Sequence, residues 1–153
     1  MSNYTVEVKQ EDTKVSIAET GPAGPRGEGL ITFFDEANSA MVTGDVVYKA
    51  SGKVAKVIAD GSVVPRVAGM IMKDVAQGSA AEYKMEGSIT LTNWTPITGA
   101  TTLSEGSFYY LSPTTAGDLT TSAPTTVGQY VVQVGYAQST TQLNLQIQPP
   151  IKL

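Results

Sequence analysis

Evenly spaced glycines are the feature that most limits the folds open to this chain of 153 residues. Eleven of them follow one another from Gly44 to Gly135 at intervals of about nine residues, within the roughly 8–12 residues that separate turns in sandwiches and barrels. No long amphipathic pattern with a period of 3.6 residues accompanies them. The spacing therefore predicts short strands joined by tight turns.

The amino-acid composition favours the same fold class. The chain contains 19 Thr and 16 Val, and β-branched residues fit a pleated sheet better than a helix. We therefore predict an all-β protein whose body is a β-sandwich or is barrel-like.

The sequence divides into an N-terminal β-arm (residues 1–20), a collagen-like neck (residues 21–29) and a β-rich body (residues 30–153). In the arm, apolar and polar residues alternate along two short segments that flank a polar stretch, which favours a hairpin. An isolated hairpin is marginal in water, so we expect the arm to become ordered only against another chain. The alternating apolar residues are Tyr4, Val6, Val8, Val15 and Ile17.

The neck carries Gly at every third position through three triplets. A triple helix needs this spacing because only Gly fits where three chains meet at the axis, and Pro presets the polyproline geometry. A single-chain Pro/Gly linker is the alternative. Three triplets are too few to hold three chains together alone, so the neck would couple trimerisation elsewhere to a stiff spacer. Its defining residues are Gly21, Pro22, Gly24, Pro25 and Gly27.

In the body, the apolar run Leu30–Phe34 precedes a segment, residues 35–40, for which we predict one helical turn. Strands separated by turn residues follow, about nine to eleven in all. They are predicted at residues 46–48, 54–58, 67–72, 83–85, 89–91, 108–111 and 130–134, with a last strand that places Leu143, Leu145 and Ile147 on one face and ends at Pro149-Pro150.

Several functional classes are excluded by residue types that the chain lacks. It has no His and no Cys, which excludes disulfides, thiolate and imidazole catalysis and the usual zinc sites. A net charge of −4 with only two Arg argues against a nucleic-acid partner. No apolar run approaches the ~18 residues of a membrane span, and the N-terminus lacks the features of a signal peptide.

The remaining candidates for chemistry are weak. Asp35 and Glu36 are adjacent, so on a strand they would point to opposite faces. Ser51 near Lys53 is an ordinary turn composition, and neither a phosphate loop nor a calcium loop occurs. We therefore predict no enzyme activity, no cofactor and no metal. A platform for sugars is one interpretation of four aromatic residues, although packing within the sheets is favoured: Trp94, Tyr109, Tyr110 and Tyr136.

Residues 112–126 are almost all small or hydroxylated, and Asp118 and Lys152 are the only charged residues after Ser107. One interpretation is a solvated surface loop that hydroxyls keep soluble. The other is a surface that packs against a copy of itself or a partner, where the lack of charge avoids a desolvation cost. The sequence does not separate these two.

The order of these parts resembles a known family. An alternating N-terminal segment that runs into Gly-Pro-x-Gly-Pro-x-Gly is similar to the start of many tailed-bacteriophage fibre and appendage proteins. The body resembles a β-rich module of phage head fibres, capsid decoration proteins and some tail-fibre tips. The residues that carry this resemblance are turns and strand ends: Gly44-Asp45-Val46-Val47-Tyr48, Val67-Ala68-Gly69-Met70, Gly87 with Ile89, Gly106-Ser107-Phe108-Tyr109-Tyr110-Leu111-Ser112, Gly117-Asp118-Leu119-Thr120-Thr121 and Val134-Gly135-Tyr136-Ala137.

The resemblance implies a homotrimer on the virion surface, made in the cytoplasm of the host bacterium. In a capsid decoration or head fibre protein, the arm would anchor to the major capsid protein or another virion protein, and the bound protein would stabilise the shell. The alternative is a tail-fibre or receptor-binding component that contacts the host surface, with a host glycan as a candidate partner. The short neck and single small body favour decoration. A bacterial carbohydrate-binding module would leave the neck and arm without a role.

Overall fold

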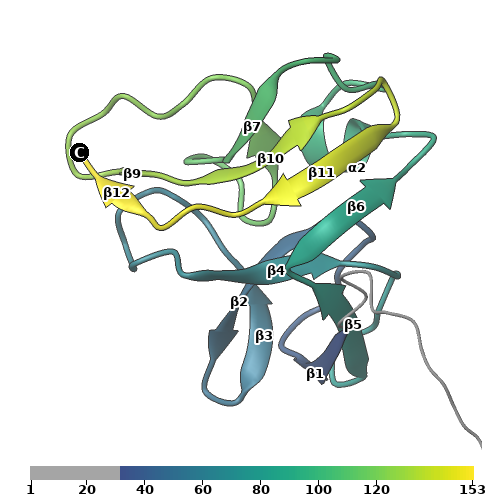
Figure 1. Ribbon diagram of the computed structural model, residues 1–153. Coiled ribbons are helices and arrows are strands. Elements are labelled where there is room, and N and C mark those ends of the chain that lie inside the picture. The colour runs from purple at the N-terminus through teal and green to yellow at the C-terminus, as the bar shows by residue number, and fades with distance from the viewer. Residues whose placement is uncertain (1–31) are drawn as a thin grey trace, which may run out of the picture.

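The computed structural model describes residues 32–153, and five of its strands close into a barrel (Figure 1). The first strand closes the barrel because it pairs in parallel with the third and antiparallel with the fifth. The remaining pairings in the barrel are antiparallel. Its strands are β1 (Phe33–Ala37), β2 (Val46–Ala50), β3 (Lys53–Lys56), β4 (Val67–Ile71) and β5 (Ala80–Lys84).

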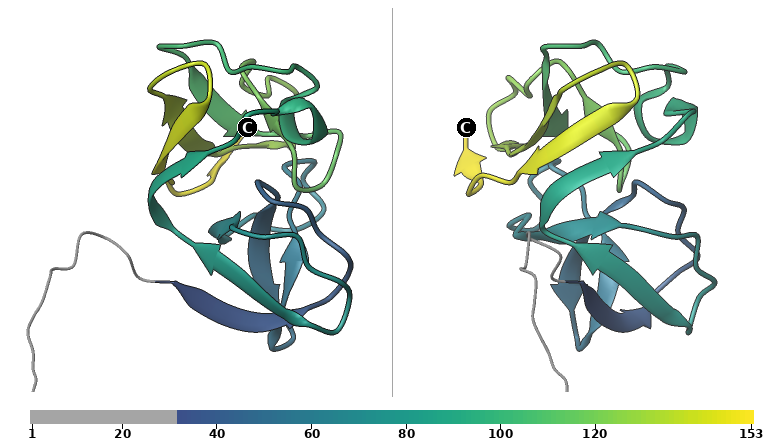
Figure 2. Two further views of the ribbon diagram at one scale, coloured as in Figure 1. Left: turned by 90° about the vertical axis from the view of Figure 1, so that its right-hand side faces the viewer. Right: turned by 45° about the vertical axis from the view of Figure 1, so that its right-hand side comes forward.

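A five-stranded antiparallel sheet of order β6-β11-β10-β7-β8 lies against the barrel, and β9 and β12 form a separate two-stranded ladder. Figure 2 shows the two layers stacked, with the chain passing from β5 into β6 across the boundary. These elements are β6 (Glu86–Thr90), the short helix α2 (Thr95–Thr98), β7 (Phe108–Leu111), β8 (Leu119–Thr120), β9 (Tyr130–Val131), β10 (Gln133–Ala137), β11 (Gln142–Gln146) and β12 (Ile151–Lys152).

Two hydrophobic cores share the central barrel strands. Successive side chains of a strand point to opposite faces, so on β2 the side chain of Val46 enters the larger core and that of Val47 the smaller one. Met70 and Ile71 divide in the same way on β4, and all four side chains are fully buried. The larger core fills the space between barrel and sheet and includes Trp94, whereas the smaller core fills the barrel. The two layers are therefore one packed body.

The β2–β3 hairpin shows how turn residues set the register. Ala50 pairs with Lys53, so two residues form the loop. Ser51 has a φ of 51° and Gly52 a φ of 79°, which is the pair of positive values that a type I′ turn requires. Gly52 adopts this conformation without a steric cost, and the following strand pairs in turn with β1.

The all-β prediction is confirmed, with twelve strands among residues 32–153 against the nine to eleven expected. Predicted and observed bounds agree fully for β7 and closely for β2 and β4. Leu143 and Leu145 are buried on one face of β11, as predicted. The arm and the neck, at residues 1–29, lie outside the described residues, so the predictions made for them stay predictions.

Three local predictions were wrong. Residues 35–40 do not form a helical turn, because β1 continues to Ala37 and is paired on both sides, with β3 and with β5. The segment 130–134 is not one strand: the chain changes partner at Val132, which is fully buried between β9 and β10. The chain also forms one more strand after Pro149-Pro150, where β12 pairs with β9. In each case long-range pairing overrides the local pattern.

Candidate interaction surfaces

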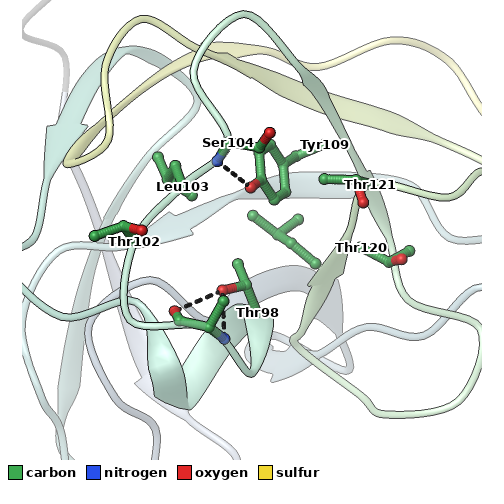
Figure 3. Close-up of a pocket in the computed structure, with 9 residues that line it drawn as sticks. Thr98, Thr102, Leu103, Ser104, Tyr109, Thr120 and Thr121 are labelled. Atoms are coloured by element: carbon green, nitrogen blue, oxygen red, sulfur yellow. Dashed lines mark hydrogen bonds between the residues drawn. The ribbon is translucent and has the colours of Figure 1, made fainter.

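A pocket lined mainly by hydroxyls lies beside α2 and β8 (Figure 3) and has a volume of about 440 Å³. Its polar groups serve the surrounding backbone: the Ser104 N–H donates to the Tyr109 hydroxyl at 2.9 Å, and the Thr98 hydroxyl lies 3.2 Å from the carbonyl oxygen of Trp94. None of its lining residues is charged. The pocket thus offers no acid, base or activated nucleophile. Its lining residues are Thr98, Ala100, Thr102, Leu103, Ser104, Tyr109, Leu119, Thr120 and Thr121.

The four aromatic residues considered for a sugar platform do not lie on one surface. Trp94 is fully buried, and its Nε1–H donates to the carbonyl oxygen of Thr141 at 3.0 Å. Tyr109 is also buried, with 3% of its surface exposed. Tyr110 and Tyr136 are half-buried on the outer face of the sheet. Two of the four are therefore core residues, as packing predicted, and the proposed platform is not formed.

The outer face of the second sheet is nevertheless aromatic and neutral at its centre. The rings of Phe108 and Tyr136 lie on paired residues of β7 and β10, with centroids 5.6 Å apart and planes inclined by 55°. Amide side chains continue the face on β11, where the Gln142 Nε2 lies 3.4 Å from the Ser88 hydroxyl. This surface can form hydrogen bonds and aromatic contacts without charge.

Part of the segment 112–126 is an internal interface. Asp45 is 1% exposed, accepts a hydrogen bond from the Val42 N–H at 2.8 Å and lies 3.2 Å from the Lys56 ammonium. Gly117 packs directly on it, since a Cβ at that position would lie 2.7 Å from the Asp45 Oδ1. Burial raises the pKa of the Asp118 carboxyl; the nearby Asp45 raises it further, and Lys56 opposes the shift.

Backbone hydrogen bonds hold the same segment in place. The Val46 N–H donates to the Gly117 carbonyl at 2.9 Å, and the Gly117 N–H donates to the Val57 carbonyl at 2.8 Å. Residues 114, 115, 121, 122, 125 and 126 are exposed. The segment therefore docks on the barrel of its own chain near Gly117 and is partly solvent-exposed elsewhere, as the surface-loop interpretation predicts. Packing against a second copy or a partner stays a prediction.

The open end of the barrel beside the start of β1 carries an apolar surface. Phe33 stacks on Tyr83, its cross-strand partner, with ring centroids 5.6 Å apart and an interplanar angle of 26°. Together with Lys49, Ala68 and Met85 these residues line a shallow pocket of about 270 Å³. Phe33 and Met85 remain 37% and 47% exposed, so the pocket is open to the surroundings.

Lys49 and Asp35 form an ion pair next to this barrel end. The Lys49 ammonium lies 2.7 Å from Asp35 Oδ2, to which the Tyr83 hydroxyl donates at 2.6 Å. The hydrogen bond from Lys49, and then that from Tyr83, hold the pKa of the Asp35 carboxyl below its usual value. Burial and the hydrogen bond to Asp35 raise the pKa of the Tyr83 hydroxyl well above its ordinary value. Glu36, on the opposite face of β1, pairs with Lys53 instead.

Asp35 and Glu36 thus point to opposite faces, as their adjacency predicted. Ser51 lies in the β2–β3 turn, and Lys53 pairs with Glu36. Within residues 32–153, no group of three or more acidic, His or Cys side chains is arranged to hold a metal ion. Nor does any helix of this described part have the length and apolar character to cross a membrane.

The predicted anchoring and neck residues lie outside the described residues, so the structure does not bring them together with any surface described here. The apolar barrel end could not be recognised in the sequence, although the apolar run Leu30–Phe34 includes Phe33. The missing information was that Met85, remote in sequence, lies beside Phe33.

No family model matches the chain, and no curated protein sequence matches it either. Among solved structures, the chain is similar to the N base of head fibre gp8.5 of bacteriophage phi29. The two are 17% identical, the likeness covers 80% of this chain and 98% of that chain, and the TM-score is 0.43.

Proposed function

We propose that the chain is a non-enzymatic structural protein of a bacteriophage virion. In this proposal it is a homotrimeric capsid decoration or head fibre protein on the virion surface, bound through its arm to the major capsid protein or another virion protein. The observation that carries the proposal is the order of the three parts: an alternating arm, three Gly-x-x triplets, and a compact body. Each part has a physical role in such a protein.

The body can project from a particle without needing a partner for its own folding. Both of its cores are filled by its own side chains. The arm, in contrast, has five alternating apolar residues within 20 residues, too few strands to form a stable sheet alone. Addition of these strands to a neighbouring chain supplies the missing partner.

Stabilisation of a shell follows from linkage. A protein that binds the assembled lattice but not its separated subunits adds its binding free energy to the assembled state. Three linked arms raise the effective concentration at the second and third sites, so a trimer binds a symmetric lattice far more tightly than a single arm. The proposal requires no catalytic or metal-binding group.

The experiment compares particles made with the full chain, with a chain lacking residues 1–20, and without the protein. We expect the truncated chain to retain its folded body by circular dichroism and to be absent from particles. Particles without the protein should assemble but release DNA at a lower temperature. Normal decoration by the truncated chain would place attachment in the body and contradict the proposed anchor.

The uncharged centre of the outer face of the second sheet favours a second candidate, a tail-fibre or receptor-binding component. Phe108, Tyr136 and the amides of β11 provide aromatic and hydrogen-bonding contacts of the kind that a host surface glycan accepts. If particles without the protein keep their thermal stability but lose adsorption to the host, this candidate replaces the first.

A further inference from the structure

An exposed apolar collar lies at the end of the barrel where the described chain begins, on the side formed by β1 and β5. We define the collar as Phe33, Phe34 and Met85, which are 37%, 62% and 47% exposed. Phe33 and Met85 line the same open pocket, with Tyr83 and Ala68 also in its lining. Phe34 follows on the outer side of β1, opposite Glu82 in the β1–β5 ladder. Large apolar side chains gathered at one end of a small protein indicate a contact surface.

We propose that the collar is the surface through which three copies of the body meet, next to the neck. This proposal rests on the trimer of the proposed function and specifies where its bodies touch. The neck alone is too short to hold three chains, since it has only three triplets. A trimer therefore needs a second contact, and the collar supplies it.

The length of chain between neck and collar keeps the three collars near a common axis. Gly27 is the last glycine of the every-third series, and five residues separate it from Phe33. Fully extended, the chain from Gly27 to Phe33 spans at most roughly 22 Å. In a triple helix the glycines of this series lie at the common axis, so in the proposed trimer every collar lies within that distance of the axis. Ile151, which is 63% exposed, lies on β12, away from β1 (Figure 1).

The charges around the collar permit close approach. Lys49 pairs with Asp35, and Lys53 pairs with Glu36, each within one chain. When copies come into contact, each charge of these two pairs therefore keeps its partner. Burial of a charge without a partner would be costly. Glu82 and Lys84 on β5 carry opposite charges beside the collar and would form a polar rim of the kind that surrounds an apolar interface centre.

The absence of Cys from the chain makes a site-specific test possible with the full-length protein. Met85→Cys places one thiol in the collar, and the matched control Val127→Cys places one at a residue that is 87% exposed in the loop before β9. Each variant is treated with a short bismaleimide. We expect crosslinked dimers from Met85→Cys and none above background from Val127→Cys. Equal crosslinking of the two, or none from either, would overturn the proposal.

A second measurement does not depend on crosslinking. Sedimentation of the full chain should show a trimer, and Phe34→Ser with Met85→Ser should raise the concentration at which it dissociates at least tenfold. The matched control, Val127→Ser with Ile151→Ser, should leave that concentration unchanged. Near-ultraviolet circular dichroism of Trp94 checks that each variant is folded.

The outcomes separate the collar from the wider proposal. A wild-type protein that sediments as a monomer would overturn the collar contact. A collar variant that stays as trimeric as the wild type would also overturn it, and this second result is the one expected if residues 30 and 31 of the same chain cover the collar. The place of the protein in the virion is decided independently, by its presence on purified particles.

Discussion

The barrel half (residues 32–85) and the sheet half (residues 86–153) share one core but present different surfaces. After Lys84 the only charged residues are Glu86, Glu105, Asp118 and Lys152, and every ion pair between described residues joins two residues of the barrel half. The sheet half uses hydroxyls and amides instead. Solubility is therefore achieved in two ways, and the barrel half holds the ion pairs that salt can screen.

The difference in charge between the two halves fits the positions that the proposed function gives them. In the proposed trimer, the charged half would lie nearest the neck and its ion pairs would border the collar. In the same proposal, the neutral half would face the surroundings of the virion. A neutral polar surface has little long-range attraction for charged molecules.

The largest effects should come from the shared core. Met70→Ala and Ile71→Ala each remove a fully buried side chain from adjacent positions of β4, and we expect each to lower the free energy of unfolding by about 2–5 kcal/mol. Although the two side chains enter different cores, both variants should unfold in one transition. Trp94 fluorescence and far-ultraviolet circular dichroism, followed in urea, measure this.

The control for these variants is Val127→Ala, at a residue that is 87% exposed, which should change stability by less than about 0.5 kcal/mol. If Ile71→Ala leaves the Trp94 transition unmoved, the halves unfold separately and the account of a single body is wrong.

A smaller effect should follow from the junction at Gly117. Its φ is +88°, and a Cβ would lie 2.7 Å from Asp45 Oδ1. We expect Gly117→Ala to cost about 2–4 kcal/mol, since it adds a steric clash to the roughly 1–2 kcal/mol of a left-handed backbone. Gly106→Ala is the matched control, because its φ is +83° and its Cβ would contact nothing within 4 Å. Equal urea midpoints for the two variants would show that the junction tolerates the added methyl group.

Acid should change the free energy of unfolding in opposite directions through one carboxyl of each half, Asp35 in the barrel half and Asp118 in the sheet half. The hydrogen bonds from Lys49 and Tyr83 lower the pKa of Asp35, so this carboxylate adds stability above its ordinary pKa of about 4, and that stability is lost as pH falls through the folded value. Burial raises the pKa of Asp118, so its ionisation destabilises the fold, and acid relieves this cost.

We therefore expect Asp35→Asn to lower stability at pH 7 and Asp118→Asn to raise it, each by less than about 1 kcal/mol. Urea titrations at pH 7 and pH 3 measure both. A gain from Asp35→Asn, or a loss from Asp118→Asn, would contradict the assigned environments.

The smallest effect should come from the surface ion pair of Lys53 with Glu36, whose side chains are 48% and 46% exposed. Lys53→Gln should lower the free energy of unfolding by at most about 0.5 kcal/mol in dilute buffer, and the difference should vanish in high salt. Gln142→Glu provides the comparison. It adds a charge to the uncharged centre of the outer sheet face, so it should make the free energy of unfolding depend on salt at a position where the wild type carries no charge. A Lys53→Gln effect that persists in high salt would mean that packing, not charge, holds this pair.

Much of the body could be predicted from the sequence, because glycine spacing and alternation are local signals. Glycines at turns adopt positive φ, as at Gly52, and Leu143 and Leu145 face the core from one side of β11. The closure of the barrel could not be predicted, since it depends on the pairing of β1 with β3 and β5. The same long-range pairing turned the expected helical turn after Phe34 into strand.

The candidate surfaces were harder to predict than the fold. Tyr109 and Tyr110 are neighbours in sequence, yet one is buried and the other faces outward, and only the strand register decides which. The collar combines Phe33 with Met85, which approach each other because β1 and β5 pair. Neither relation is visible in a local window of sequence.

The most direct test of the proposed virion role is the number of copies of this protein on purified, intact phage particles. Quantitative mass spectrometry against the major capsid protein gives that number. We predict many copies, in a multiple of three, distributed over the shell. A few copies confined to the tail vertex would contradict the decoration account and favour a fibre, and absence from the particle would contradict a virion role altogether.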